Sequence, residues 1–471
     1  MKATKFNTFL IFGFWIALFL TSCNRDDIKF DDVASELRFS RDTVFCDTVF
    51  HQVRSETYAL KVYNNEDKDV LIPNIKLGRG SGSQYRINVD GHSGYNFDNV
   101  ALRKKDSLYI FVEIAPQASG PEAVATDEIK FTTGAGEQAV TLFSVVQDAE
   151  FFVQTGSTPV QITNNTTWNN DKAKIIYGDL EIAPNVTLDI NAGTRVIFFK
   201  NSGMKVRNGA TVNVNGDLDS EVIFRSDRSD PRYDTIPKNW NSIQFSAGSN
   251  LNMNYAKIFG GTTGLELRQA NATIKNTIVH TFQEFGIKSI GSTVNASNLV
   301  TNNCGTASFG IFRGGNVTIT HSTLANYWQF GGAVAADALY ATNEWKNDTN
   351  QTEYGALTLD VRNTIMYNSL YNAVVLKPTS GQSFNYKFEN SLMNYENSSL
   401  AGFNFDSNAS VVNSLKNSNP KFVQTGTKHL NLRVANDSPA KSKGNSAYVS
   451  LFPLDIVKNT RSTPPTIGAY Q

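Results

Sequence analysis

The feature that most constrains the fold of this chain is an even spacing of apolar pairs between Leu188 and Phe224. In each pair, one intervening position separates the two apolar side chains. The pairs are Leu188/Ile190, Val196/Phe198, Met204/Val206, Val212/Val214 and Val222/Phe224, and their spacing is constant until it widens slightly before the last pair. This alternation is typical of a β-strand with one buried face. Strands this short need neighbours to bury that face.

The spacing also predicts how the strands are arranged. Three equal steps lead from Leu188 through Val196 and Met204 to Val212. A closed coil with three short sides needs such a period, because each coil then stacks on the previous one and buries its inward pairs. Gly193, Gly209 and Gly216 fit the corners, where the backbone bends sharply. The pattern therefore predicts a parallel β-helix.

A second unit continues the pattern toward the C-terminus, and each copy ends at an apolar residue after a polar corner. The units end at Ile258, Ile278, Leu299, Leu324, Ile365 and Leu392. The step from Leu324 to Ile365 is clearly longer than the others, so we expect it to contain one extra coil, near Tyr340. We expect the corner asparagines to stack as ladders that satisfy turn backbone groups; these are Asn276, Asn298, Asn363 and Asn390.

Residues 37–148 have a different pattern, with seven short alternating segments separated by polar turns. The first segment is "LRFSRDTVF", which begins at Leu37, and the last is "AVTLFSVV". Seven such segments within residues 37–148 are typical of an Ig-like β-sandwich. The Cys…Trp…Cys core of antibody domains is absent from the segment.

The N-terminal segment resembles a bacterial lipoprotein signal. Residues 1–22 contain basic residues followed by the apolar run "FLIFGFWIALFL", and "LTSC" ends at Cys23. The resemblance implies that Cys23 carries the lipid; the alternative is a secretory signal with a chance cysteine. The acidic segment 23–36 is similar to a surface-export signal, or else is a solvated tether. We therefore expect an outer-membrane lipoprotein that faces the cell exterior.

The charge balance and the cysteine spacing argue against a nucleic-acid partner and against a zinc site. The chain has 43 basic and 43 acidic residues and no basic stripe, which argues against a nucleic-acid partner. Cys46 and Cys304 lie far apart in different predicted domains, so a disulfide between them is not expected. We expect Cys304 to be a buried thiol. No cysteine spacing typical of a zinc site occurs.

Several segments carry a wider resemblance. The repeats from Leu188 to Phe224, with "NWNSIQF" after them, resemble right-handed parallel β-helix proteins of the pectin-lyase-like superfamily. "TLANYW" and the ending from Ser438 to Gln471 are similar to segments of Bacteroidetes lipoproteins with this repeat. The resemblance implies an all-β chain, with the Ig-like sandwich at 37–148 and a right-handed parallel β-helix at 149–471 that a C-terminal cap closes at its last coil. Gln471 stands where such endings commonly have glutamate, so any ion site there is expected to be lost.

The loop "RSDRSDPRYD" is the first candidate site. Asp227, Asp230 and Asp234 could supply oxygen ligands to Ca²⁺, the one cofactor that the sequence suggests. Its arginines, among them Arg225 and Arg228, could neutralise a uronate or act as a lyase base. The alternating charges equally describe a solvated loop.

The second candidate is an aromatic group within the longest insertion. Tyr327, Trp328, Tyr340 and Trp345 could stack on sugar rings, and nearby acids such as Asp337 could accept sugar hydroxyls. The alternative is that these rings pack the insertion against the coils.

No catalytic residue is assigned from the sequence. The histidines, among them His280, His321 and His429, form no Ser/His/Asp arrangement, and no pair of acids suits a hydrolase. The leading hypothesis is a surface lipoprotein whose β-helix is a binding or structural module, for polysaccharide or another surface component. The alternatives are a polysaccharide lyase or glycoside hydrolase on uronate-containing glycans, and a protein adhesin.

Overall fold

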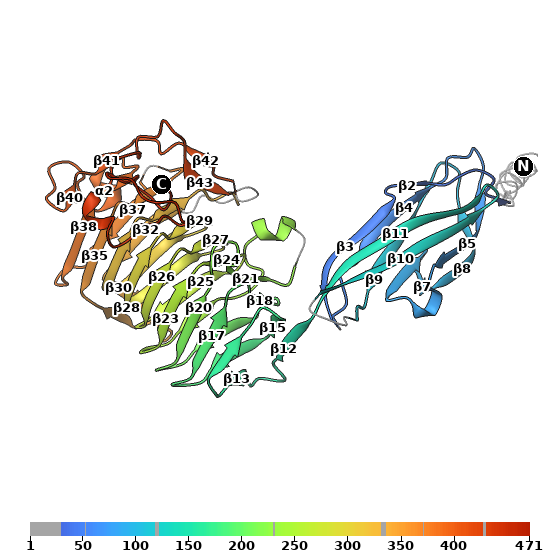
Figure 1. The fold of residues 1–471 in the computed structure, drawn as a ribbon, viewed down its shortest axis with the longest axis horizontal. Coiled ribbons are helices and arrows are strands. Elements are labelled where there is room, and N and C mark those ends of the chain that lie inside the picture. The colour runs from blue at the N-terminus through green and yellow to red at the C-terminus, as the bar shows by residue number, and fades with distance from the viewer. Residues whose placement is uncertain are drawn as a thin grey trace, which may run out of the picture. The chain divides into compact units, whose positions relative to one another are not determined.

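The structure is a computed structural model that describes residues 30–51, 53–117, 122–228, 231–330, 336–370, 372–426 and 430–471. The chain divides into two compact units (Figure 1). One contains the described residues up to Gln117 together with Ala123–Val146, and the other contains Glu122 and the described residues from Gln147 to Gln471. Helices are short, and in the described part of the chain none has the length and hydropathy of a membrane-spanning segment. The lipidation residue Cys23 lies outside the described residues.

The first unit is a β-sandwich of two sheets. One sheet has the order β1 (Asp31–Asp32), β5 (Val70–Leu77), β10 (Glu122–Thr133), β11 (Gly136–Gln147), β3 (Thr43–Phe50), and β8 (Asn96–Leu102) also pairs with β5. The other has the order β2 (Arg38–Phe39), β4 (Tyr58–Tyr63), β9 (Ser107–Ile114), β6 (Tyr85–Val89), β7 (His92–Gly94). Inward residues such as Leu60, Ile72 and Phe131 are fully buried.

Two details of the sandwich differ from the expected strands. The segment that begins at Leu37 is not one strand, because β2 pairs in one sheet and β3 in the other. The sequence pattern does not predict β8, because Asp98 and Asn99 interrupt the alternation of its apolar residues. It is nevertheless held by a long antiparallel register with β5, from Val70 opposite Leu102 to Lys76 opposite Asn96.

The second unit is a parallel β-helix, as the spacing predicts, and the chain is all-β. Its coils contribute strands to two long parallel sheets. The 11-stranded sheet comprises β12 (Ala149–Val153), β15 (Ala173–Tyr177), β18 (Arg195–Phe198), β21 (Val222–Ser226), β24 (Ala256–Phe259), β27 (Ile278–Phe282), β29 (Val300–Cys304), β31 (Thr323–Asn326), β36 (Ile365–Asn368), β39 (Leu392–Met393) and β41 (Leu415–Lys416).

The 17-stranded sheet forms the other sides of the coils. It comprises β13 (Val160–Ile162), β14 (Thr166–Trp168), β16 (Asp179–Ile182), β17 (Thr187–Asn191), β19 (Gly203–Val206), β20 (Thr211–Asn215), β22 (Ile243–Phe245), β23 (Asn250–Asn254), β25 (Thr263–Arg268), β26 (Asn271–Lys275), β28 (Phe285–Ser297), β30 (Ala307–Thr320), β32 (Asp337–Thr342), β35 (Leu357–Arg362), β37 (Val374–Lys377), β38 (Phe384–Glu389) and β40 (Val411–Val412).

The strand register confirms the period read from the sequence. Leu188 on β17 lies opposite Val212 on β20, and Ile190 lies opposite Val214. All five apolar pairs of the segment are buried in one continuous core. The six later units all lie on the same side of the coils, because the strand at each unit belongs to the 11-stranded sheet.

The prediction of an extra coil between Leu324 and Ile365 is wrong. Thr323 on β31 lies directly opposite Ile365 on β36, so one coil separates them. The long strand β30 pairs with β32 through its first half and with β35 through its second half. The extra residues between β32 and β35 form a hairpin of β33 (Glu344–Lys346) and β34 (Thr352–Tyr354) instead.

The asparagine ladder is confirmed at Asn276 and Asn298 but not at Asn390, which donates to the carbonyl oxygen of Lys443 (2.9 Å) instead. Asn276 and Asn298 both have φ of 49°, in the left-handed region that asparagine tolerates better than most residues. The amide of Asn276 donates to Asn254 (2.8 Å), and Asn298 donates to Asn276 (2.8 Å). His321, with φ of 48°, occupies this corner one coil further on. The corner residues thus combine an unusual backbone conformation with side-chain bonds between coils.

Residues 438–471, which we call the strap, follow the last coil and lie along the outer flank of the 11-stranded sheet. Ile456 and Ala469 pack with Val300 on β29, and Ile467 packs with Leu392 on β39. The ammonium of Lys458 reaches Asp217, 241 positions earlier, at 2.5 Å. The strap therefore spans many coils, whereas the sequence suggested a cap at the last one.

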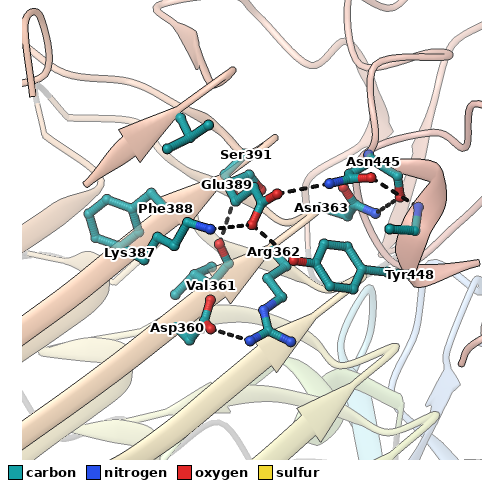
Figure 2. Close-up of polar contacts among 12 residues, drawn as sticks. Asp360, Val361, Arg362, Asn363, Lys387, Phe388, Glu389, Ser391, Asn445 and Tyr448 are labelled. Atoms are coloured by element: carbon teal, nitrogen blue, oxygen red, sulfur yellow. Dashed lines mark hydrogen bonds and ion pairs between the residues drawn. The ribbon is translucent and has the colours of Figure 1, made fainter. Parts of the chain in front are cut away.

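A network of polar contacts fastens one part of the strap (Figure 2). The carboxylate of Glu389 on β38 accepts hydrogen bonds from Asn445 (2.8 Å) and Tyr448 (2.9 Å) of the strap. Lys387, on the same strand, forms an ion pair with Glu389 at 2.8 Å. The guanidinium of Arg362 lies 5.0 Å from the centre of the Tyr448 ring. These contacts satisfy a buried carboxylate and hold the strap to the coil.

Candidate functional site: an aromatic cleft beside Asp337

A cleft of about 550 Å³ opens on the 17-stranded sheet, beside β32 and β37. Strands, a coil corner and a short helix all contribute to its walls. The residues that line it are Phe285, Thr306, Phe312, Asp337, Tyr340, Leu370, Asn372, Val375, Lys377 and Leu400. An apolar concavity with a few polar groups is the usual form of a small-ligand site.

Gly310 on β30 makes room for the aromatic wall. It lies opposite Lys288 on one neighbouring strand and opposite Tyr340 on the other. A Cβ at this position would come within 2.9 Å of the Phe285 ring and 3.0 Å of the Phe312 ring. Those rings meet edge to face with centroids 5.5 Å apart, and Phe312 lies 5.4 Å from Tyr340. The missing side chain therefore permits three rings to gather on an otherwise regular sheet.

Asp337 supplies the carboxyl group of the cleft. Its side chain is only 7% exposed, and burial raises its pKa to about 7, although Lys377 acts in the opposite direction. No described side chain donates a hydrogen bond to this carboxylate. The exposed ammonium of Lys377 lies 5.7 Å from the centre of the Tyr340 ring. The cleft thus presents a carboxyl group, a cation and aromatic rings to one volume.

Two exposed leucines form an apolar rim. Leu370 is 41% exposed, and Leu400 on α2 (Ser398–Ala401) is 57% exposed. Asn397 caps the N-terminus of α2 by accepting from the Leu400 amide at 3.0 Å. Gly402 ends the helix with φ of 79°, where a Cβ would lie 1.7 Å from the carbonyl oxygen of Leu376 on β37. Close packing of the helix end therefore fixes the position of Leu400.

The four predicted aromatic residues do not form one group. Tyr340 lines the cleft, and Trp345 packs against Phe312 at 5.4 Å with the Lys288 ammonium 4.5 Å from its ring. Tyr327 instead contacts Phe422 on β42 (Phe422–Gln424), which pairs with β43 (Asn431–Val434). Trp328 contacts Phe330 at 5.1 Å.

The hairpin β33–β34 is tied to the sheet by charged contacts. Asp348, in its turn, forms an ion pair with Arg268 at 2.9 Å, and Glu353 pairs with Arg313 at 3.1 Å. The ring contact between Trp345 and Phe312 adds an apolar attachment of the hairpin. These contacts place Trp345 behind Phe312, where it supports the wall of the cleft.

Sequence reasoning missed Phe285, Phe312 and Lys377 as members of this site. The available signal was Gly310 within the strand segment "FGIF", because a glycine inside a strand often marks the close approach of other groups. Lys377 carries no such signal, since its place follows only from the pairing of β32 with β37.

In the charged loop "RSDRSDPRYD", two arginines contact other side chains of the same loop. The guanidinium of Arg225 pairs with Asp234 at 2.7 Å, and that of Arg228 lies 3.9 Å from the centre of the Tyr233 ring. Asp227 directly follows β21, and Asp230 lies outside the described residues. Within the described ranges, no three His, Cys, Asp or Glu side chains group closely enough to hold a metal ion. Calcium binding therefore stays a prediction.

Cys46 and Cys304 are buried, and His280 is partly buried. Cys46 and Cys304 are free, and burial raises the pKa of each thiol to about 12. His280 stacks on Phe259 with centroids 5.1 Å apart, and burial lowers its pKa to about 4. His429 lies outside the described residues. The buried thiols confirm the expectation for Cys304 and suit packing better than nucleophilic chemistry.

No family model matches the chain, and no curated protein matches it. Among solved structures, it is similar to pectate lyase Pel9A with a TM-score of 0.33 and 10% identity, over 69% of this chain and 87% of that one. A family 123 glycoside hydrolase from Clostridium perfringens matches with a TM-score of 0.17 and 11% identity, over 27% of this chain and 26% of the hydrolase. The VesB protease of Vibrio cholerae matches with a TM-score of 0.15 and 11% identity, over 24% of this chain and 31% of the protease.

Proposed function

We propose that the protein is a surface lipoprotein whose β-helix binds a polysaccharide in the aromatic cleft. The cleft itself is the observation that carries the proposal. Tyr340 and Phe312 line the cleft with aromatic rings that can pack on the C–H face of a sugar, and Leu370 and Leu400 extend the apolar contact. Asp337 and Lys377 can pair with hydroxyl or charged groups at its edge.

The lipid anchor is the second part of the proposal and rests on "LTSC" at Cys23. Several acyl chains hold a protein at a membrane far more firmly than one does. Incorporation of labelled fatty acid into the intact protein, and its loss in Cys23→Ser, tests the anchor. Digestion of the protein by protease added to whole cells tests whether it faces the exterior.

A glycan panel in affinity electrophoresis tests the binding proposal. We expect retardation of the purified protein by at least one glycan, and at least a tenfold weaker interaction, about 1.4 kcal/mol, for Tyr340→Ala. Tyr177→Ala is the matched control, because Tyr177 is 54% exposed on β15 and lies outside the cleft. Retardation by no glycan, or equal loss in both variants, contradicts the proposal.

A lyase or hydrolase is the second candidate function, and Asp337 favours it. A carboxyl group with a pKa near 7 can transfer protons at neutral pH. However, Asp337 is the single carboxylate among the described residues that line the cleft, whereas most glycoside hydrolases use two. Release of reducing ends or unsaturated products, with loss in Asp337→Asn, would favour an enzyme over a binding module.

A further inference from the structure

The strap contains a buried cation with unused hydrogen-bond donors. The Arg461 side chain is 4% exposed, and its Nη2 donates to Asn298 (2.7 Å) and to the carbonyl oxygen of Ala469 (3.3 Å). Its Nε and Nη1 atoms are buried and find no acceptor among the described residues. Burial lowers the pKa of Arg461 to about 10, so the guanidinium still carries its charge at neutral pH. A buried charge of this kind normally has a partner.

Asp455 acts on Arg461 electrostatically but is already occupied. Its carboxylate accepts hydrogen bonds from the amides of Val457 (3.0 Å), Asn459 (2.7 Å) and Gln471 (2.9 Å). Arg461 forms no ion pair with Asp455 or with any other described carboxylate. The positive charge therefore lacks a direct counter-ion in this part of the protein.

His321, at the corner next to Asn298, has a buried donor of its own without a described acceptor. Asn363 donates to its Nε2 (3.2 Å), and the orientation of that amide is fixed because its oxygen accepts from the Asn445 amide (2.6 Å). Burial, and then the charge of Arg461, lowers the pKa of His321 to about 3, so the ring is neutral. Its one proton must then lie on Nδ1, which is buried and has no described acceptor.

The ladder places these two side chains at neighbouring corners. Asn298 and His321 occupy the same corner in adjacent coils, which lie about 4.8 Å apart. Arg461 is bonded to Asn298, and its charge acts on His321. The ring of Phe452, also from the strap, lies edge-on 6.3 Å from the His321 ring. Two buried side chains with unused N–H donors, one of them charged, thus lie at neighbouring corners beside an aromatic ring of the strap.

We propose that a small monovalent anion, of the size of chloride or bromide, binds between Arg461 and His321 beneath the strap. An anion accepts hydrogen bonds without donating any and neutralises the guanidinium. A water molecule would satisfy one or two donors, but it would bring two hydrogens that need acceptors of their own and would leave the charge uncompensated. The bound anion would help to hold the strap against the coils.

Thermal unfolding of the full chain tests this site directly. At constant ionic strength, chloride is exchanged for gluconate, whose anion is too large for a buried site. We expect the melting temperature to rise with the logarithm of the chloride concentration, because a ligand that binds only the folded state stabilises it. Crystals grown in bromide should show an anomalous peak beside Arg461 and His321.

Arg461→Met removes the donors while keeping an extended apolar side chain, so we expect it to abolish the chloride dependence. Lys458→Met is the matched control, because it removes an exposed strap cation that pairs with Asp217. If Arg461→Met does not fold, His321→Asn restores the residue found at this corner in neighbouring coils and should weaken the dependence severalfold. Equal melting temperatures in chloride and gluconate, or crystals with a water and no bromide at the site, overturn the proposal.

Discussion

Tyr448 donates a 2.9 Å hydrogen bond to the carboxylate of Glu389, which lies 59 positions earlier on β38 (Figure 2). This bond joins the strap to a coil through Glu389, a residue that is only 9% exposed. Burial by itself would raise the pKa of Glu389, but the bonds from Lys387, Tyr448 and Asn445 outweigh it and lower the pKa. The carboxylate is therefore stabilised in its charged form by the docked strap.

We expect Glu389→Gln to destabilise the protein by roughly 1–3 kcal/mol, because its amide group would face hydrogen-bond donors. Urea unfolding measures the loss, and limited proteolysis should show earlier cleavage within the strap. Because the folded pKa is lowered from 4.5, the contribution of Glu389 is present above pH 4.5 and is lost as the pH falls below it. Glu396→Gln, at an exposed glutamate nearby, should change neither measurement.

Asp337→Asn should change the pH dependence of stability in the opposite sense. The folded pKa is raised from 3.8 to about 7, so the charged form is disfavoured in the folded state. Burial of Asp337 therefore costs the wild-type protein no stability below pH 3.8. The free energy of unfolding falls as the pH rises from 3.8 toward 7, and above pH 7 the loss is complete. We expect the variant to be more stable at pH 8 by on the order of a few kcal/mol. Superimposable pH profiles from thermal unfolding would exclude this effect.

Gly310→Ala tests the aromatic wall. The new methyl group would force the rings of Phe285 and Phe312 apart, so we expect a loss of roughly 1–3 kcal/mol in stability and weaker glycan binding. Gly82→Ala is the control, because its Cβ would meet nothing within 4 Å. Full glycan affinity in Gly310→Ala would show that these rings do not form the binding surface.

Two substitutions at Asn276 separate backbone strain from hydrogen bonding. Asn276→Ala loses the ladder bonds and keeps a side chain at φ of 49°, whereas Asn276→Gly loses the same bonds without the strain. We expect alanine to be the less stable variant by about 1–2 kcal/mol. Equal unfolding free energies in urea would mean that strain at this corner is negligible.

The repeat was predictable because it is local. Leu188 and Val212 follow from alternation and spacing alone, and Asn298 follows from a corner that recurs in each coil. The insertion was harder, because sequence length cannot distinguish an extra coil from the hairpin between β32 and β35. Only the pairing of Thr323 with Ile365 decides between them.

The candidate site was only partly predictable for a related reason. Tyr340 and Asp337 were visible as an aromatic and an acid in the longest insertion, yet Phe285 and Lys377 lie far from them in sequence. Stacking of coils brings these residues into one cleft. Tyr327 lies close to Tyr340 in sequence, but it belongs to the side of the coil that the segment around Phe422 covers.

The strap has a consequence for the order in which the protein matures. Its residues follow every coil along the chain, so a ribosome delivers them after all the coils have been made. Until the strap docks, the flank that includes Val300 and Leu392 stays uncovered in any coils that have already formed. Docking at Asp217, Asn298 and Glu389 then closes that flank from early coils to late ones. A truncation within the strap would leave the coil count unchanged and yet keep the molecule in its vulnerable, immature form.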